Sequence, residues 1–201
     1  SIQDFHNALH DTELFATIRP HYIEGLCRTT HFAECRAVVE SCDVLLHAPI
    51  TNIAMALAER AYAILHGERG ELIGNFTILH RELNSHTSII LEDIPQGEPL
   101  ESAMLTMSQD KLLSGLKEFE ERMRRADISH NNLRKQNIIV DRNGHWHPIR
   151  LYYTTIGYGG DSRELETLCA EIKRVAPVDD CLNEPLSAYR TEYIPLREGL
   201  R

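Results

Sequence analysis

The chain contains the stretch His130-Asn131-Asn132-Leu133-Arg134-Lys135-Gln136-Asn137-Ile138-Ile139-Val140-Asp141, on which the interpretation of the whole sequence depends. A histidine opens this polar stretch, an asparagine follows seven positions later, and three β-branched apolar residues come next, as is typical of a strand. Asp141-Arg142-Asn143-Gly144 has the composition of a tight turn, and His145 to Tyr153 is predicted to be the return strand. The sequence therefore predicts a polar loop that leads into a β-hairpin.

This stretch resembles the catalytic loop of the protein-kinase superfamily, in which His-Arg-Asp is followed by four residues, an Asn and an apolar strand. His130 and Asn137 stand at the positions of that His and of the metal-binding Asn. Asn132 stands at the position of the Asp that accepts the substrate proton. Because an amide cannot accept a proton as a carboxylate does, the resemblance implies a kinase-like fold with altered chemistry.

Kinases hold their metal ions with a second Asp, which follows the hairpin after the catalytic loop. Counting from Asn137 places this Asp at Arg150, or at Tyr152 if two extra residues are allowed. No Asp or Glu occurs between Asp141 and Asp161. Since a cation at Arg150 repels magnesium, the resemblance leaves Asn137 and Asp161 as the candidate metal ligands.

The segment Cys42 to Pro49 is predicted to form a short apolar strand that ends at His47, and a helix over Ile50 to His66 is predicted next to it. This unit resembles the strand and helix of small atypical kinases, including bacterial lipopolysaccharide-core kinases. His47 stands where the phosphate-binding Lys is expected, and Glu59 where its pairing Glu is expected. No Lys occurs before Lys111, so a shifted alignment does not recover one.

The region from Tyr22 to Val39 should carry a glycine-rich phosphate loop, but its one glycine is Gly25. Backbone amides cradle a phosphate only where the chain can approach it closely, which glycine permits. The other elements expected in this half of the chain are an amphipathic helix over Ile2 to Phe15, strands between Tyr22 and Leu46, and a strand pair over Leu72 to Glu82 and Thr87 to Glu92 that turns at Asn84-Ser85.

Residues 91–100 resemble a kinase hinge, with an apolar residue, the acidic Glu92 and then Pro and Gly before a helix. Helices are predicted over Lys111 to Arg125 and Ser162 to Val175. Asp161 resembles the Asp that bonds back to the catalytic loop, and it would also serve as a helix N-cap. The fold class expected is α+β, a two-lobed kinase-like fold with a small antiparallel-sheet N-lobe (1–91), a hinge (92–99) and an abbreviated helical C-lobe (100–201).

Composition limits the partners of the chain. Its net charge of −9 argues against nucleic acid, because phosphate binding requires clusters of Lys and Arg. No apolar run reaches the ~20 residues of a membrane span. The five cysteines are odd in number and lack metal-type spacing, which indicates reduced thiols in a cytoplasmic protein.

Two functions from different classes agree with these observations. The first is a pseudokinase that binds a protein partner or a small molecule without phosphoryl transfer. The second is a divergent ATP- and Mg-dependent kinase of a small molecule or lipopolysaccharide sugar, for which Asp161, Asp141 or Glu59 would supply the metal carboxylate. In both, a ligand in the cleft would be lined by His47, Glu59, Glu92, Asn132, Asn137 and Arg150. A third possibility is that the resemblance is accidental and the chain is a mixed α/β interaction domain.

Overall fold

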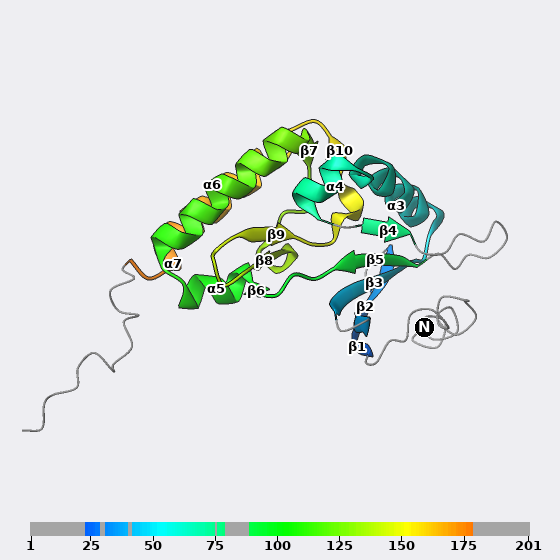
Figure 1. Cartoon of the computed structure of the whole chain (residues 1–201), viewed down its shortest axis with the longest axis horizontal. Coiled ribbons are helices and arrows are strands. Elements are labelled where there is room, and N and C mark those ends of the chain that lie inside the picture. Colours follow the sequence, from blue (N-terminus) through cyan, green and yellow to red (C-terminus); the bar gives the residue numbers. More distant parts are fainter. Residues whose placement is uncertain (1–22, 29–30, 40–41, 75, 79–88, 179–201) are drawn as a thin grey trace, which may run out of the picture.

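The computed structural model describes residues 23–28, 31–39, 42–74, 76–78 and 89–178 of the 201-residue chain (Figure 1). The helix expected over Ile2 to Phe15 and the turn at Asn84-Ser85 lie outside these residues. The described elements are helices and antiparallel strands, so the α+β class expected from the sequence is confirmed.

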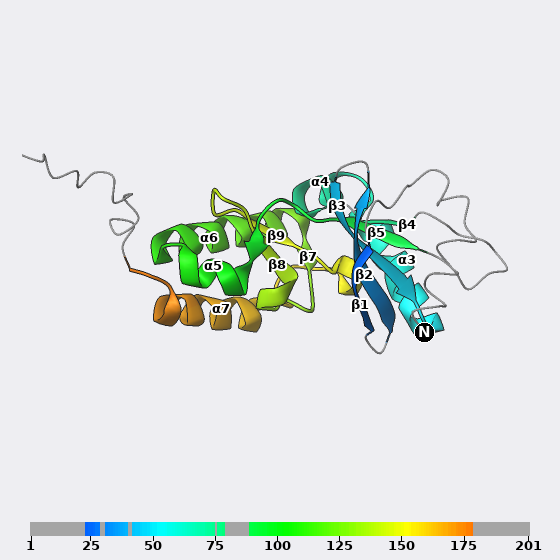
Figure 2. The same cartoon turned by 90° about the horizontal axis from the view of Figure 1, so that it is seen from below.

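A five-stranded antiparallel sheet forms one end of the molecule (Figures 1 and 2). Its order is β1-β2-β3-β5-β4. The strands are β1 (Ile23–Arg28), β2 (Phe32–Val39), β3 (Cys42–Pro49), β4 (Phe76–Ile78) and β5 (Ile90–Asp93). Because side chains alternate between the faces of a strand, Glu34 and its cross-strand partner His47 point to the same face of the sheet.

Helix α3 (Asn52–Leu65) packs on that face of the sheet through a stripe of mostly small residues, including Ala54, Ala58 and Ala61. The helix begins two residues later than the sequence predicted, because the Thr51 hydroxyl accepts the backbone N–H of Ala54 and caps the first turn. Gly67, which follows the C-cap residue His66, has a positive φ of 95°, a conformation that glycine adopts without a clash at Cβ.

The strand expected over Leu72 to Glu82 is confirmed over Phe76–Ile78, which pairs with β5 as expected, whereas its first two residues are helical and residues 79–82 lie outside the described residues. Residues 68–73 form the short helix α4 (Glu68–Ile73), which buries Ile73, and only residues 76–78 of the range are described as a strand. Glu68 and Glu71 lie in the first turn of α4, where a carboxylate is favourable. Arg69 ties this helix to the following half of the chain by donating to the carbonyl of Ala126 (2.8 Å).

The other end of the molecule is mainly helical, with the long α6 packed against α7 (Figure 2). Short strands and turns lie between these helices and the five-stranded sheet. The elements are β6 (Glu98–Pro99), α5 (Leu100–Thr106), α6 (Gln109–Ala126), β7 (Ile128–Ser129), the 3-10 turn η1 (Lys135–Asn137), β8 (Ile138–Val140), β9 (Trp146–Pro148), the 3-10 turn η2 (Leu151–Tyr153), β10 (Thr155–Ile156) and α7 (Ser162–Val175).

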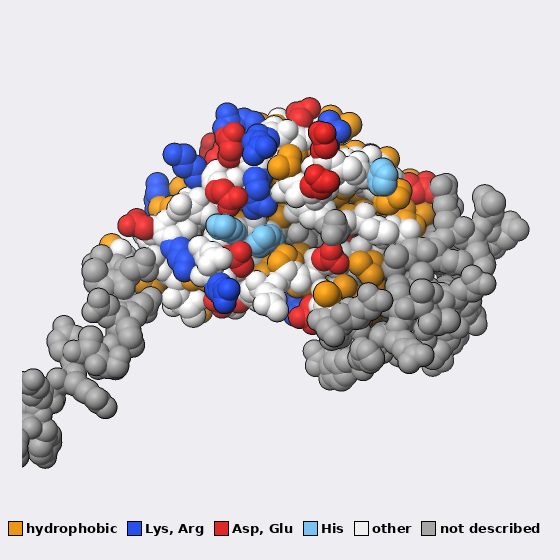
Figure 3. All heavy atoms as spheres, viewed as in Figure 1, with side chains coloured by type: hydrophobic (Ala, Val, Ile, Leu, Met, Phe, Trp, Pro, Cys, Tyr) orange, Lys and Arg blue, Asp and Glu red, His pale blue; other side chains and the backbone are white. Residues whose placement is uncertain are grey.

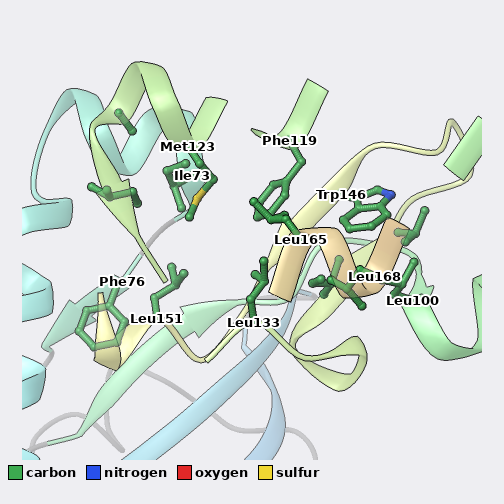
Figure 4. Packing of buried hydrophobic residues seen from close by; sticks show 14 of the residues in the cluster. Ile73, Phe76, Leu100, Phe119, Met123, Leu133, Trp146, Leu151, Leu165 and Leu168 are labelled. Carbon is green, nitrogen blue, oxygen red and sulfur yellow. The ribbon is translucent and has the colours of Figure 1, made fainter. Parts of the chain in front are cut away.

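One hydrophobic core runs from the sheet and α3 through to α7. Figure 4 shows Phe119 and Trp146 beside Leu165 and Leu168, with Phe76 and Leu151 at the sheet end of the same cluster. Helix α6 comes very close to β9, because a Cβ added at Gly115 would lie 2.0 Å from the carbonyl of Gly144 and 2.8 Å from the ring of Trp146. Glycine at this position is what permits the close packing.

The predicted return strand over His145 to Tyr153 ends early. β9 stops at Pro148, Arg150 takes a left-handed conformation with a φ of 61°, and residues 151–153 form η2. The backbone amides of Arg150 and Leu151 donate to a side-chain carboxylate of the five-stranded sheet, Glu92, rather than to a neighbouring strand. The Glu92 carboxylate therefore accepts the two backbone hydrogen bonds that a continuing strand would have made with its neighbour.

The surface over α6 carries both signs of charge. In Figure 3, Lys and Arg side chains alternate there with Asp and Glu side chains, so this face has no patch of a single sign. Within the described residues, no helix is both long enough and apolar enough to cross a bilayer.

Candidate functional site

The polar loop His130 to Asn137 lies between β7 and β8, and Asp161 fixes its start. The Asp161 carboxylate is buried, and its two oxygens accept the backbone N–H groups of His130 (2.5 Å) and Asn131 (2.7 Å). Asp161 is the N-cap residue of α7, as expected, and its backbone carbonyl accepts the N–H of Leu165, but its side chain makes no capping bond to that helix. The expected bond back to the loop is present. Both oxygens of this carboxylate are thus already engaged with backbone donors.

His130 is buried and holds the loop against β9. Its Nε2 lies 2.9 Å from the carbonyl oxygen of Ile149, and its Nδ1 lies 3.2 Å from the backbone N–H of Asn132. With Nε2 as the donor and Nδ1 as the acceptor, both contacts are satisfied by the neutral ring. Burial lowers the pKa of His130 below its ordinary value, although the bond to Ile149 opposes this shift. The geometry gives this histidine a structural role.

Asn137 is buried at the end of the loop, and both ends of its side-chain amide are bonded. The Nδ2 donates to the backbone carbonyl of Asn132 at 2.7 Å. The Oδ1 accepts from Nη1 of Arg150 at 2.9 Å. The one side-chain oxygen that could face a cation is therefore directed at a guanidinium.

Arg150 joins the loop to the five-stranded sheet. Its Nε and Nη2 donate to the carboxylate of Glu34 on β2, with N–O distances of 2.5 to 3.1 Å. Its Nη1 also donates to the carbonyl of Gln136 at 3.0 Å. Such fork-like pairing with a carboxylate is stronger and more directional than a single charged contact. Burial would lower the pKa of Arg150, but the bonds to Glu34 outweigh it and raise the pKa.

His47 lies on β3 between two carboxylates and is fully buried. Its Nε2 lies 2.5 Å from Oε2 of Glu92. Its Nδ1 lies 3.3 Å from Oε2 of Glu34, an ion-pair contact without the alignment of a hydrogen bond. Burial alone would lower the pKa of His47, but Glu92 and Glu34 outweigh it and raise the pKa to about 9. The imidazole is therefore charged at neutral pH.

The two carboxylates complete a chain of alternating charge, which we call the ionic cluster: Glu92, His47, Glu34 and Arg150. Burial would raise the pKa of Glu34, but the contact with charged His47 and the hydrogen bonds from Arg150 outweigh it and lower the pKa to about 2. Glu92 also accepts the backbone N–H groups of Arg150 (3.1 Å) and Leu151 (2.6 Å). Each buried charge thus faces an opposite one, which offsets much of the cost of burial.

His47, Glu92, Asn137 and Arg150 were expected from the sequence to line one site, and the structure brings these four together. Glu34, which provides the main partner of Arg150, was not expected there. A signal was present, because Glu34 is a charged residue inside the apolar run of a predicted strand. Glu59, the expected partner of His47, is half-buried on α3, whereas the carboxylates in contact with His47 come from β2 and β5.

Aromatic rings fill the space beside the ionic cluster. Phe32 on β2 stacks on Tyr152 of η2 with ring centroids 4.1 Å apart, and the His47 ring meets the edge of Tyr152 at 5.3 Å. Burial raises the pKa of Tyr152. The contact between the sheet and η2 is therefore packed with rings around its charged centre.

The residues present do not fit a magnesium ion. Mg²⁺ requires oxygen ligands in near-ideal octahedral geometry, usually from carboxylates and water. Here Asn137 Oδ1 accepts from a guanidinium, and both oxygens of Asp161 accept backbone N–H groups. In the part of the chain that the structure describes, no group of three or more His, Cys, Asp or Glu residues is arranged to hold a metal ion.

No protein-family model matches the chain, and no curated protein matches it. What the site does must be inferred from its own residues.

Proposed function

We propose that this chain is a catalytically inactive, kinase-like protein, a pseudokinase, which acts by binding a partner or ligand. The order of its elements supports the proposal. A small antiparallel sheet with one packed helix, α3, precedes residues 92–99, and a mainly helical part with the loop His130 to Asn137 follows. A two-lobed kinase fold has this order, with residues 92–99 as its hinge.

The position of Asp161 supports the same proposal. In the resemblance, this residue corresponds to the Asp that bonds back to the catalytic loop. Its carboxylate accepts two consecutive backbone N–H groups at the start of that loop. The bond is therefore the contact that the resemblance implies.

The single observation that carries the proposed lack of activity is the bond from Arg150 to Asn137. Arg150 stands where the resemblance requires the second metal-binding Asp, and its guanidinium takes the oxygen of Asn137. A phosphoryl-transfer site needs divalent cations there to neutralise the phosphate oxygens. The guanidinium of Arg150 is a fixed cation at this position, so it repels a metal ion. Its pairing with Glu34 also shields its charge from a phosphate group.

The test is a thermal-shift titration with ATP, with and without Mg²⁺ or Mn²⁺, together with an assay of phosphate transfer. We expect no metal-dependent rise in melting temperature for the wild type, because the candidate metal ligands Asn137 and Asp161 are already bonded to other groups of the protein. The comparison variants are Asn137→Ala, which removes the candidate ligand, and Asn143→Ala, which makes the same change in an exposed turn.

A metal-dependent shift that Asn137→Ala removes and Asn143→Ala retains would overturn the proposal. The alternative, a divergent kinase of a small molecule or lipopolysaccharide sugar, would then lead, and a screen of sugar substrates would follow. ATP binding without any metal dependence would agree with a pseudokinase whose cleft still accepts a nucleotide. No binding at all would direct the search toward a protein partner.

A further inference from the structure

The guanidinium of Arg150 lies among oxygen atoms that come from the five-stranded sheet and from the turn η1. The two carboxylate oxygens of Glu34, on β2, lie 2.5 to 3.1 Å from its Nε and Nη2. The backbone carbonyl oxygen of Gln136 and the Oδ1 of Asn137 lie 3.0 and 2.9 Å from its Nη1. We call these oxygens of Glu34, Gln136 and Asn137 the oxygen cage.

The charges around the oxygen cage require a cation at this position. Two buried carboxylates, Glu34 and Glu92, both contact the imidazolium of His47. Because one imidazolium balances only one carboxylate, a second cation is needed, and Arg150 supplies it. A buried charge that loses its partner is strongly destabilising.

Apolar side chains form a wall beside the oxygen cage. Leu45 on β3 lies opposite Glu92 on β5, and it packs with Ile139 and Ile149 in one cluster. None of these three residues is more than 2% exposed. The Arg150 side chain itself is 23% exposed, so a small cation could reach the cage from solvent if this side chain were removed.

The backbone at Arg150 is fixed in a conformation that directs its side chain to the cage. Its φ of 61° lies in the left-handed region, which is uncommon for a residue other than glycine. The carboxylate of Glu92 holds this conformation by accepting the N–H groups of Arg150 (3.1 Å) and Leu151 (2.6 Å). Such a conformation persists where the surrounding contacts determine it.

We propose that Arg150 is a tethered substitute for a bound cation, which fills the oxygen cage and joins the sheet to the loop His130 to Asn137. The inference deepens the proposed function and rests on it, because it names the group that occupies the position of the metal ions in the kinase resemblance. It implies that this joint forms without a divalent metal ion.

The geometry of the cage selects a guanidinium rather than Mg²⁺. Nitrogen–oxygen distances of 2.5 to 3.1 Å are those of charge-assisted hydrogen bonds. Mg²⁺ requires oxygens at ~2.1 Å in octahedral geometry. The carboxylate of Glu34 instead faces two nitrogens of the guanidinium fork, the arrangement in which Arg recognises carboxylates. Without the Arg150 side chain, the cage is therefore a site for free guanidinium.

The test removes the tethered cation and offers a free one. Arg150→Gly deletes the side chain, and glycine adopts the positive φ without strain. Guanidinium chloride is added up to about 50 mM, far below the molar concentrations at which it denatures proteins. We expect a saturable rise of about 3 °C or more in the melting temperature, because the cation binds only the folded state. Tetramethylammonium chloride, which has no N–H donor, should not reproduce the rise.

Two further variants separate the cage from general effects of the salt. Arg134→Gly removes an exposed arginine of the same loop, so its melting temperature should not respond to guanidinium. Arg150→Gly combined with Glu34→Gln also removes the carboxylate of the cage, so the response should be lost. Magnesium chloride should raise the melting temperature of Arg150→Gly by less than guanidinium does, because the cage lacks octahedral geometry.

The inference is overturned if guanidinium gives no rise in Arg150→Gly, or an equal rise in the variant that also carries Glu34→Gln. A larger response to Mg²⁺ than to guanidinium would overturn it too, since the cage would then be a metal site. If Arg150→Gly is unfolded without added cation, the refolded fraction, read from the fluorescence of Trp146, replaces the melting temperature, and the same outcomes decide. No nucleotide is used, whereas the proposed function fails on metal-dependent ATP binding by the wild type, so the two can fail separately.

Discussion

Raising the pH from 6.5 to 9 is expected to lower the free energy of unfolding through the buried imidazole of His47. In the folded protein its pKa rises from the ordinary 6.5 to about 9, so the folded state keeps a proton that the unfolded chain has released. The stabilisation is fully present below pH 6.5 and is lost as the pH rises through 9. Each pKa unit corresponds to about 1.4 kcal/mol, so the loss amounts to about 3 kcal/mol.

The assay is urea unfolding followed by the fluorescence of Trp146, which is fully buried and is the only tryptophan in the chain. Between pH 6.5 and 9 the unfolding free energy is expected to fall by up to about 1.4 kcal/mol per pH unit, the slope for one proton. The pH range of the measurement ends at 9 because Cys35 also contributes above that pH. Its pKa is raised from 9.0 to about 12 in the folded protein, so the unfolded chain loses this proton first and the free energy of unfolding falls further.

Two variants isolate the contribution of His47. His47→Gln keeps a polar side chain of similar size but cannot be protonated, so its stability should be nearly flat over the same range. His145→Gln removes an exposed histidine and should retain the wild-type slope. The reasoning fails if the wild type loses less than about 1 kcal/mol, or if His47→Gln keeps the full slope.

Three further outcomes are expected. Because the pKa of His130 lies below its ordinary value, stability should fall as the pH drops below 6.5, and urea unfolding should show a flatter profile for His130→Gln. Arg150→Leu should lower the free energy of unfolding by about 2–4 kcal/mol, slightly less than the loss of a fully buried pair, because 23% of the Arg150 side chain is exposed. The control Arg134→Leu, at an exposed arginine, should lower it by less than about 0.5 kcal/mol, and equal losses would contradict the role of the ionic cluster. Gly115→Ala should lower the melting temperature, corresponding to about 1–3 kcal/mol, because the added carbon meets the carbonyl of Gly144, although this change usually stabilises a helix.

The parts of the fold that the sequence predicted well have strong local signals. The helix from Ser162 to Val175 was predicted with its observed bounds, because its apolar residues recur at helical spacing directly after Gly159-Gly160-Asp161. The strand that begins at Cys42 was also predicted, with its end at His47, and in the structure it runs two residues further, to Pro49. In both cases nearby residues alone determine the structure.

The missed parts depend on contacts between distant residues. The return strand was predicted to continue to Tyr153, but it ends at Pro148 because Glu92 accepts the amides of Arg150 and Leu151. The role of Glu34 depends equally on a partner far away in the sequence. The register of β2 and β3 sets Glu34 opposite His47, but its other partner, Arg150, lies 116 positions away in the sequence.

The separation of Glu34 and Arg150 has a consequence for folding kinetics. The two residues lie 116 positions apart, so their ion pair closes a very long loop, a contact that forms slowly. Glu34, His47 and Glu92 come together within the sheet, and the guanidinium that balances their acidic excess joins only when residues 149–153 dock. We therefore expect this docking to follow the rate-limiting step, so that loss of Arg150 mainly speeds unfolding and hardly slows folding. The ionic cluster would then set the lifetime of the folded state rather than the speed at which it is reached.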